Sequence, residues 1–295
     1  MTPPESSLQA FPKGISIIGT GKLGSSLAVH LHRRGYRIRS VFNRSEKSCL
    51  KLAEKVECEL TGEFPKDCGE LGDLVFLTLP DDAIAGHVQK LIPILDDEIK
   101  PAWAHTSGAV MSEVLNPLKS NSGGIVSFHP VQTFNGHNEE TAFKNTFVTL
   151  EGSEALCMEL KSLVRALGAR PLLVTPEQKK AIHLAAVFIS NFYVALFSGA
   201  RAILKEHKVD VRTRELFGPI AEQTLQSLLQ HSPREVLTGP IARGDADSVK
   251  KHLEILNRMP DWDPVYREMS KAALRLAQEM PDRDQGKDKE LENLL

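Results

Sequence analysis

A glycine-spaced stretch near the start of the chain constrains its fold more than any other feature. Residues 14–24 read Gly-Ile-Ser-Ile-Ile-Gly-Thr-Gly-Lys-Leu-Gly, so an apolar run leads directly into the spacing G-x-G-x-x-G at Gly19, Gly21 and Gly24. The first glycine of this spacing allows a tight turn, the second lets the backbone approach a pyrophosphate, and the third permits close packing of helix on strand. Taken alone the pattern is weak, because a plain tight turn also satisfies it.

The residues that follow favour nucleotide binding. A helical pattern at Leu23, Leu27 and Leu31 is followed by a second predicted strand over 38–42, which closes a unit of about thirty residues, the length expected of βαβ. The unpaired N–H groups at the start of the helix would face the phosphates. We therefore predict a dinucleotide-binding loop, and its residues are Gly19, Thr20, Gly21, Lys22, Leu23 and Gly24.

The tip of the second strand predicts which dinucleotide is preferred. Asn43, Arg44 and Ser45 stand where an NAD-selective fold would carry Asp or Glu against the ribose 2′-hydroxyl. Arg44 can pair with a 2′-phosphate, and no carboxylate is there to repel it. This favours NADP over NAD. A solvated turn in which Ser45 caps a helix over 46–56 is an alternative that is compatible with it.

Three further predicted strands, 74–79, 102–105 and 125–128, end in polar residues. Ligands of open α/β sheets bind outside the carboxyl ends of the strands. We expect Ser107 to contact the cofactor and His129 to contact the substrate, although Ser107 could instead cap a helix and His129 could be a core histidine. The remaining predicted cofactor contacts, at the end of the first of these strands, are Thr78, Leu79 and Pro80.

The last predicted strand ends at residue 174. Strands predicted over 146–150 and 171–174 flank a helix over 153–167, and Thr175-Pro176-Glu177-Gln178 then has the form of a capping box. Beyond it only helical patterns follow. We predict a Rossmann-like α/β domain over 12–175, an all-α domain over 176–280 and a charged flexible tail over 281–295.

The first helix of the second domain carries polar residues on one face. Lys180, His183 and Asn191 share that face with Val187. We expect His183 to act as an acid or base, with Lys180 and Asn191 placing the substrate. Alternatively these side chains pair with the other domain or with another subunit and do no chemistry.

A glycine-containing loop over 238–245 offers one more candidate. Arg243 in this loop could reach an anionic group of the substrate or the cofactor, because a guanidinium suits bidentate recognition of a carboxylate. The loop could equally be a plain connection in which Asp245 caps the next helix.

Composition limits the partners. A net charge of −2 gives no reason to expect nucleic acid, and the four cysteines have no metal-ligand spacing, so we predict no metal.

The start of the chain lacks the apolar core of a signal peptide, which favours a cytoplasmic protein. The apolar stretch 181–200 contains polar residues and is interpreted as a core helix rather than a membrane span. The helix over 176–206 is apolar on many sides, which predicts a homodimer through the helical domain.

Taken together, these motifs resemble the Rossmann-like proteins with a C-terminal domain of unknown function 2520 (DUF2520). The resemblance implies a relative of pyrroline-5-carboxylate reductase, the F420-dependent NADP oxidoreductases and the β-hydroxyacid dehydrogenases. It implies an NADP-binding domain, a helical dimerisation domain similar to the C-terminal domain of 6-phosphogluconate dehydrogenase, and a site in the cleft between them. Val187 departs from the β-hydroxyacid dehydrogenase pattern, which has Lys four residues before the Asn. The stretches that carry the resemblance are the glycine loop, 78–82, 105–109, 128–134, 183–191 and 239–245.

The sequence thus predicts an NADP(H)-dependent oxidoreductase acting on a small polar carbonyl, imine or hydroxy compound in the interdomain cleft. Nicotinamide would carry the hydride, and the protein would supply a proton donor or acceptor. The alternative from another class is a non-catalytic NADP-binding sensor or assembly protein.

Overall fold

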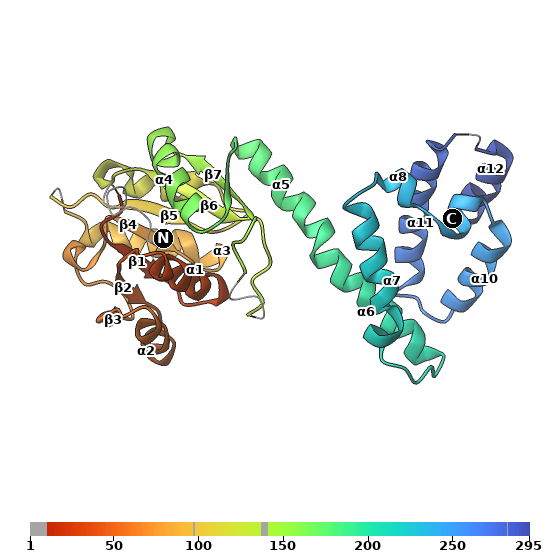
Figure 1. The fold of residues 1–295 in the computed structure, drawn as a ribbon, viewed down its shortest axis with the longest axis horizontal. Helices are drawn as coiled ribbons and strands as arrows, with labels where there is room; N and C mark the ends of the chain where they lie inside the picture. Colours follow the sequence, from red (N-terminus) through yellow and green to blue (C-terminus); the bar gives the residue numbers. More distant parts are fainter. Residues whose placement is uncertain (1–10, 97, 137–140, 282) are drawn as a thin grey trace, which may run out of the picture. The chain divides into compact units, whose positions relative to one another are not determined.

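The computed structural model describes residues 11–96, 98–136, 141–281 and 283–295. The chain divides into two compact units, with the division after Phe192. The first unit is built on a β-sheet and the second consists of helices (Figure 1).

The sheet of the first unit has eight strands in the order β3-β2-β1-β4-β5-β6-β7-β8. All neighbouring strands pair in parallel except β6 and β7, which pair antiparallel. The strands are β1 (Ile15–Ile18), β2 (Ile38–Phe42), β3 (Leu60–Gly62), β4 (Leu74–Leu77), β5 (Ala102–His105), β6 (Ile125–Pro130), β7 (Phe147–Gly152) and β8 (Arg170–Leu173).

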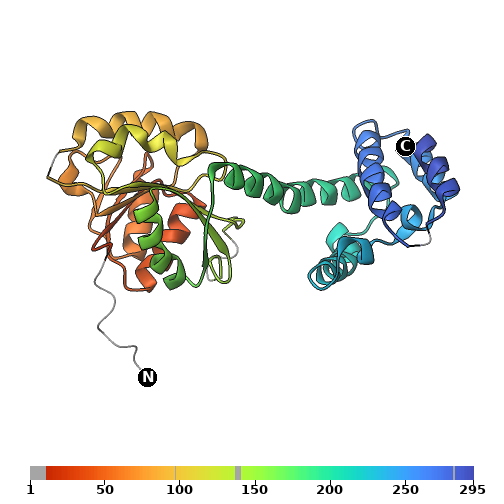
Figure 2. The same ribbon diagram turned by 90° about the horizontal axis from the view of Figure 1, so that it is seen from above.

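Helices cover both faces of this sheet, which is why its central strands are apolar on both sides (Figure 2). Three of them pack on one face: α1 (Lys22–Arg33), α2 (Glu46–Lys55) and α4 (Glu154–Ala166). The other face is covered by α3 (Asp81–Leu91) and the 3₁₀ segment η3 (Ser112–Asn121). Two shorter 3₁₀ turns, η1 (Cys68–Glu70) and η2 (Ile92–Ile94), complete the connections. The predicted Rossmann-like architecture is confirmed.

The helix α5 (Pro176–Ile189) follows the last strand and starts with the predicted capping box. Thr175 accepts from the backbone N–H of Gln178, whose side chain accepts in return from the backbone N–H of Thr175. We predicted that the helical domain starts at residue 176, but α5 counts with the sheet unit. Lys179 on this helix contacts the turn after β5, and His183 contacts His129 of β6.

In the second unit, all regular elements of the described residues are helices, joined by turns and short connections. Its helices are α6 (Asn191–Glu206), α7 (Thr213–Leu228), α8 (Pro233–Val236), α9 (Gly239–Arg243), α10 (Ala246–Leu256), α11 (Asp263–Gln278) and α12 (Gln285–Leu294). Its core is formed by buried side chains of α9, α10, α11 and α12, among them Val249 and Leu274. The predicted all-α class of this part of the chain is confirmed.

The prediction of a flexible tail over 281–295 is wrong. Residues 285–294 form α12, and Leu291 on this helix is fully buried in the core of the second unit. The ion pair between Arg283 and Asp288, 2.6 Å long and almost entirely buried, holds the start of the helix. Charged residues dominate the segment, but one apolar face suffices to anchor a helix.

One helical segment of the described residues, Pro176–Glu206, is long and apolar enough to cross a membrane by length and composition, with a mean hydropathy of 1.7. A single such segment is weak evidence for a span, but its most apolar window is not buried, so the interpretation of 181–200 as a core helix is wrong. The segment is interrupted at Ser190, whose hydroxyl donates to the carbonyl of Ala186 at 2.7 Å.

Candidate active site

The glycine loop between β1 and α1 has the geometry that a dinucleotide needs. Gly19 adopts φ +107°, a conformation that side chains disfavour. A Cβ at Gly24 would lie 2.3 Å from the Gly19 carbonyl oxygen, so only glycine allows this close packing. A Cβ at Gly21 would meet nothing within 4 Å, which leaves the space in which a ligand can approach the backbone.

A cavity of about 1350 Å³ adjoins this loop. It is lined by the glycine loop and by residues at and beyond the carboxyl ends of β2, β3 and β4, the edge of the sheet where ligands of α/β folds bind. The hydroxyl oxygen of Thr20 is buried there and has no hydrogen-bond partner among the described residues. The open backbone at Gly21 and this unpaired hydroxyl fit a dinucleotide phosphate.

The predicted 2′-phosphate contacts lie at the tip of β2. Asn43 and Arg44 line the cavity, and Arg44 is exposed. Ser45 caps α2 by accepting the backbone N–H of Ser48 at 3.4 Å. Acidic and basic side chains are both present around the rest of the cavity, so its wall is not uniformly positive: Glu63, Lys66, Glu70, Asp82 and Lys90.

A second hollow, of about 400 Å³, opens beside the first. The two share Gly21, Thr78, Leu79 and Pro80, and Lys22, Leu23 and Gly24 line the smaller one. Thr78 also fastens the glycine loop, because its hydroxyl donates to the Gly19 carbonyl at 2.6 Å. The far side of the smaller hollow is lined by Ser107, Gly108, His129, Gln132 and His183, among others.

Two imidazoles converge over Gly108 in this smaller hollow. A Cβ placed on Gly108 would lie 2.8 Å from Nε2 of His129 and 2.3 Å from Nδ1 of His183. The ring centroids are 5.8 Å apart and the rings meet edge to face at 72°. His129 comes from β6 and His183 from α5, so the fold brings together two predicted site residues that are far apart in sequence.

Burial, with the charge of Lys179, lowers the pKa of two histidines in this region. Burial, followed by the charge of Lys179 and then His183, lowers the pKa of His129 to about 4. Burial and Lys179 likewise lower the pKa of His105 to about 4. Nδ1 of His105 accepts the backbone N–H of Ser107 at 3.2 Å, which leaves the proton of the neutral ring on Nε2.

Ser107 holds the turn that carries Gly108. Its hydroxyl oxygen accepts the backbone N–H groups of Ala109 at 3.2 Å and Val110 at 2.9 Å. This is the capping role that the sequence left open, and it does not occupy the hydroxyl proton, which can still be donated to a ligand.

The lysine that reaches this region is Lys179, which sequence reasoning missed. Lys179 is fully buried, whereas Lys180 is exposed and lies outside both hollows. The sequence carried only part of the signal, because Lys179 and Lys180 precede His183 by four and three residues and both spacings place a residue near its helix face.

The other two predicted site residues lie outside the hollows. Asn191 is exposed at the start of α6, where its Oδ1 lies 2.8 Å from the Ser190 hydroxyl oxygen. Arg243 ends α9 in the second unit and lies 3.9 Å from Asp245, which caps α10 by accepting from Ser248 at 3.0 Å. Their roles toward a substrate stay predictions.

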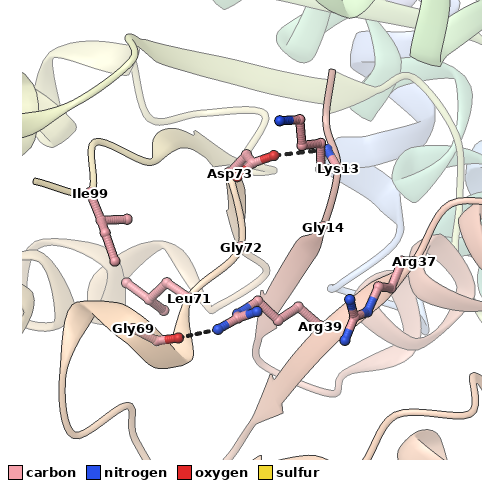
Figure 3. A pocket seen from close by; sticks show the side chains of 9 residues that line it. All are labelled: Lys13, Gly14, Arg37, Arg39, Gly69, Leu71, Gly72, Asp73 and Ile99. Atoms are coloured by element: carbon pink, nitrogen blue, oxygen red, sulfur yellow. Dashed lines mark hydrogen bonds between the residues drawn. The ribbon is translucent and has the colours of Figure 1, made fainter. Parts of the chain in front are cut away.

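A third hollow, of about 290 Å³, lies at the amino ends of β1, β2 and β4 (Figure 3). The backbone N–H of Lys13 donates to Asp73 there at 2.8 Å, and Arg39 donates to the carbonyl of Gly69. Its place at the amino edge of a parallel sheet separates it from the candidate site. In the part of the chain that the structure describes, no cluster of three or more His, Cys, Asp or Glu could hold a metal ion.

Comparison with known proteins agrees with the fold and the glycine loop. Residues 1–130 match the Rossmann-like domain family. Residues 146–273 match the domain of unknown function DUF2520. The chain thus matches a Rossmann-like domain followed by a DUF2520 domain, the combination that its motifs predicted.

Several solved structures have the same architecture. A Bacteroides fragilis protein provisionally named an NADP oxidoreductase is 29% identical, with a TM-score of 0.75 over 89% of this chain and 98% of that one. A Thermotoga maritima protein is 25% identical, with a TM-score of 0.69 over 90% and 98%. A Coxiella burnetii pyrroline-5-carboxylate reductase, 20% identical, has a TM-score of 0.54 over 94% and 97% and shares the fold. No curated protein sequence matches the chain.

Proposed function

We propose that this protein is an NADP(H)-dependent oxidoreductase that acts on a small polar carbonyl, imine or hydroxy compound. The observation that carries the proposal is the pair of imidazoles over Gly108, in a hollow that shares part of its wall with the dinucleotide cavity. The similarity to the Bacteroides fragilis protein, named for an NADP oxidoreductase, supports it.

Different residues of the chain would bind the cofactor and exchange a proton with the substrate. The glycine loop and Thr20 would hold the pyrophosphate, and Asn43 and Arg44 the ribose 2′-phosphate. A bound nicotinamide donates or accepts the hydride. His183 and His129 present ring nitrogens to one point, where a substrate oxygen or nitrogen can exchange a proton with either ring.

The proposal is tested by following the absorbance of NADPH with a panel of small keto acids, imino acids and hydroxy acids. We expect oxidation of NADPH with at least one member, or reduction of NADP⁺ with a hydroxy acid. Tight binding of NADPH without turnover on any class would contradict catalysis and favour the alternative, a non-catalytic NADP-binding sensor or assembly protein.

Arg44→Ala should remove most of a preference for NADPH over NADH. A charge-assisted pair with the 2′-phosphate contributes about 1.5–3 kcal/mol, so NADPH affinity should fall roughly tenfold or more while NADH affinity stays nearly constant. Fluorescence titration measures both. Arg33→Ala is the control, since this exposed arginine of α1 lies outside the cavity. Equal affinities of the unmodified protein for both cofactors would contradict the assignment.

We also propose a homodimer through the helical region. Large apolar side chains are exposed on α5 and α6, with Phe188 at 60%, Ile189 at 79% and Val194 at 70%. A second copy of the chain would remove such surface from water. Sedimentation should show a dimer, and Ile189→Asp should shift it toward monomer. A stable monomer of the unmodified protein at micromolar concentration would contradict the proposal.

The location that fits this function is the cytoplasm. All four cysteines of the chain are free and buried, as suits a reducing compartment. The net charge of −2 gives no electrostatic reason for nucleic acid or an anionic membrane surface as a partner.

A further inference from the structure

Lys179 on α5 is a buried cation with an unusual set of partners. Its side chain is fully buried, and its ammonium donates to the backbone carbonyls of Ser107 at 3.0 Å, Gly108 at 2.8 Å and Val110. An ammonium has three donors, and here each meets one carbonyl of the same short turn. Lys179 therefore joins α5 to the turn after β5.

Burying an ammonium costs free energy unless hydrogen bonds or opposite charges stabilise it. Burial lowers the pKa of Lys179 to about 8, while the carboxylates of Glu151 and Asp81 favour the charged form. At neutral pH the side chain of Lys179 is thus largely protonated, and its ammonium can use all three donors. An apolar residue of similar length would fill the space without these bonds, so packing alone does not account for a lysine here.

The turn that Lys179 grips is the turn on which the two imidazoles meet. Its Gly108 lies beneath Nε2 of His129 and Nδ1 of His183. His183 also follows Lys179 by one helical turn on α5 and therefore shares its face. The same side chain thus fixes the floor of the hollow and the helix that delivers one of its rings.

We infer that Lys179 is a positioning residue of the candidate active site, which clamps the Ser107–Val110 turn to α5 so that His129 and His183 converge over Gly108. The inference rests on the proposed function for its meaning in catalysis, but the clamp itself is a property of the free protein. Lys179 lies beneath the turn and contacts neither hollow, so it touches no substrate.

The clamp has a second consequence, because it fixes a positive charge beside the imidazoles. The groups that act on His129 are Lys179 and His183, which lower its pKa, and Asp81, which raises it. Of the two charged groups that lower the pKa of His129, Lys179 has the larger effect, and loss of its ammonium removes that effect.

The test uses Lys179→Met in the full-length protein and needs no substrate. Histidine ring resonances followed by NMR against pH should show the pKa of His129 rising part of the way toward its ordinary value near 6.5, because burial, the larger cause of its low pKa, remains. Hydrogen exchange at the amides of Ala109 and Val110 should accelerate. Titration with NADPH should show little change, since Lys179 does not line the dinucleotide cavity. Lys180→Met, its exposed neighbour on α5, should leave the His129 titration unchanged.

A measurement on the unmodified protein covers the case in which Lys179→Met does not fold. Reductive methylation with formaldehyde, followed by mass spectrometry, should modify Lys180 much faster than the buried Lys179. Equal rates at the two lysines would overturn the clamp. A folded Lys179→Met protein with unchanged His129 titration and unchanged exchange would overturn it as well. These outcomes do not depend on activity, so they are distinguishable from a failure of the NADPH oxidation panel.

Discussion

His183→Gln is expected to lower turnover about a hundredfold while NADPH affinity and the folded state are retained. Glutamine keeps much of the size and hydrogen-bonding capacity of histidine but cannot exchange a proton near neutral pH, and loss of a general acid or base costs at least that factor. The ring lies over Gly108 beside the glycine loop, so the loss should appear in kcat rather than in cofactor binding. Steady-state kinetics with a substrate from the panel measures it.

The imidazole of His129 provides a second test of this prediction. If His129 and His183 act on one substrate atom, His129→Gln should cause a loss of the same order, and the double variant should lose less than the product of the two. His32→Gln on α1, outside both hollows, is the control. Near-normal turnover of His183→Gln would reduce His183 to a packing residue and leave His129 as the candidate.

The fold was predictable because its signals are local. The apolar strands over 38–42 and 102–105 were expected with the bounds that the structure has, and the capping box at Thr175 marked the start of α5. The strand β3 was missed, since it has three residues, all of them half-buried, and no clear alternation. α12 was missed because charge dominates its composition and one apolar face anchors it.

The site was predictable only in part because its contacts are long-range. Pattern reasoning placed His129 at a strand end and His183 on a helix face, but their meeting over Gly108 depends on how α5 returns to the sheet. The choice between Lys179 and Lys180 shows the same limit. Adjacent helix residues point about 100° apart, and both lie near the face of His183. Only the carbonyls of the Ser107–Val110 turn distinguish them.

Gly108→Ala is expected to abolish most of the activity while the protein still folds and binds NADPH. The new methyl carbon would lie 2.3 Å from Nδ1 of His183 and 2.8 Å from Nε2 of His129, well inside contact distance. Gly108 is not among the residues with positive φ, so alanine fits its backbone. The nearest colliding atoms belong to side chains, which can move aside, and such overpacking costs about 1–3 kcal/mol of stability.

The loss of activity in Gly108→Ala should come from displacement of the two imidazole rings. Rings pushed aside by roughly 1 Å no longer converge on one substrate atom, and misplacement of that size can lower turnover about a hundredfold. Thermal unfolding and NADPH titration establish that the variant is folded and loaded, and steady-state kinetics measures the loss. Gly86→Ala on α3, where a Cβ meets nothing within 4 Å, is the matched control and should keep full turnover. Normal turnover of Gly108→Ala would mean that the two imidazoles do not act as a pair at this point.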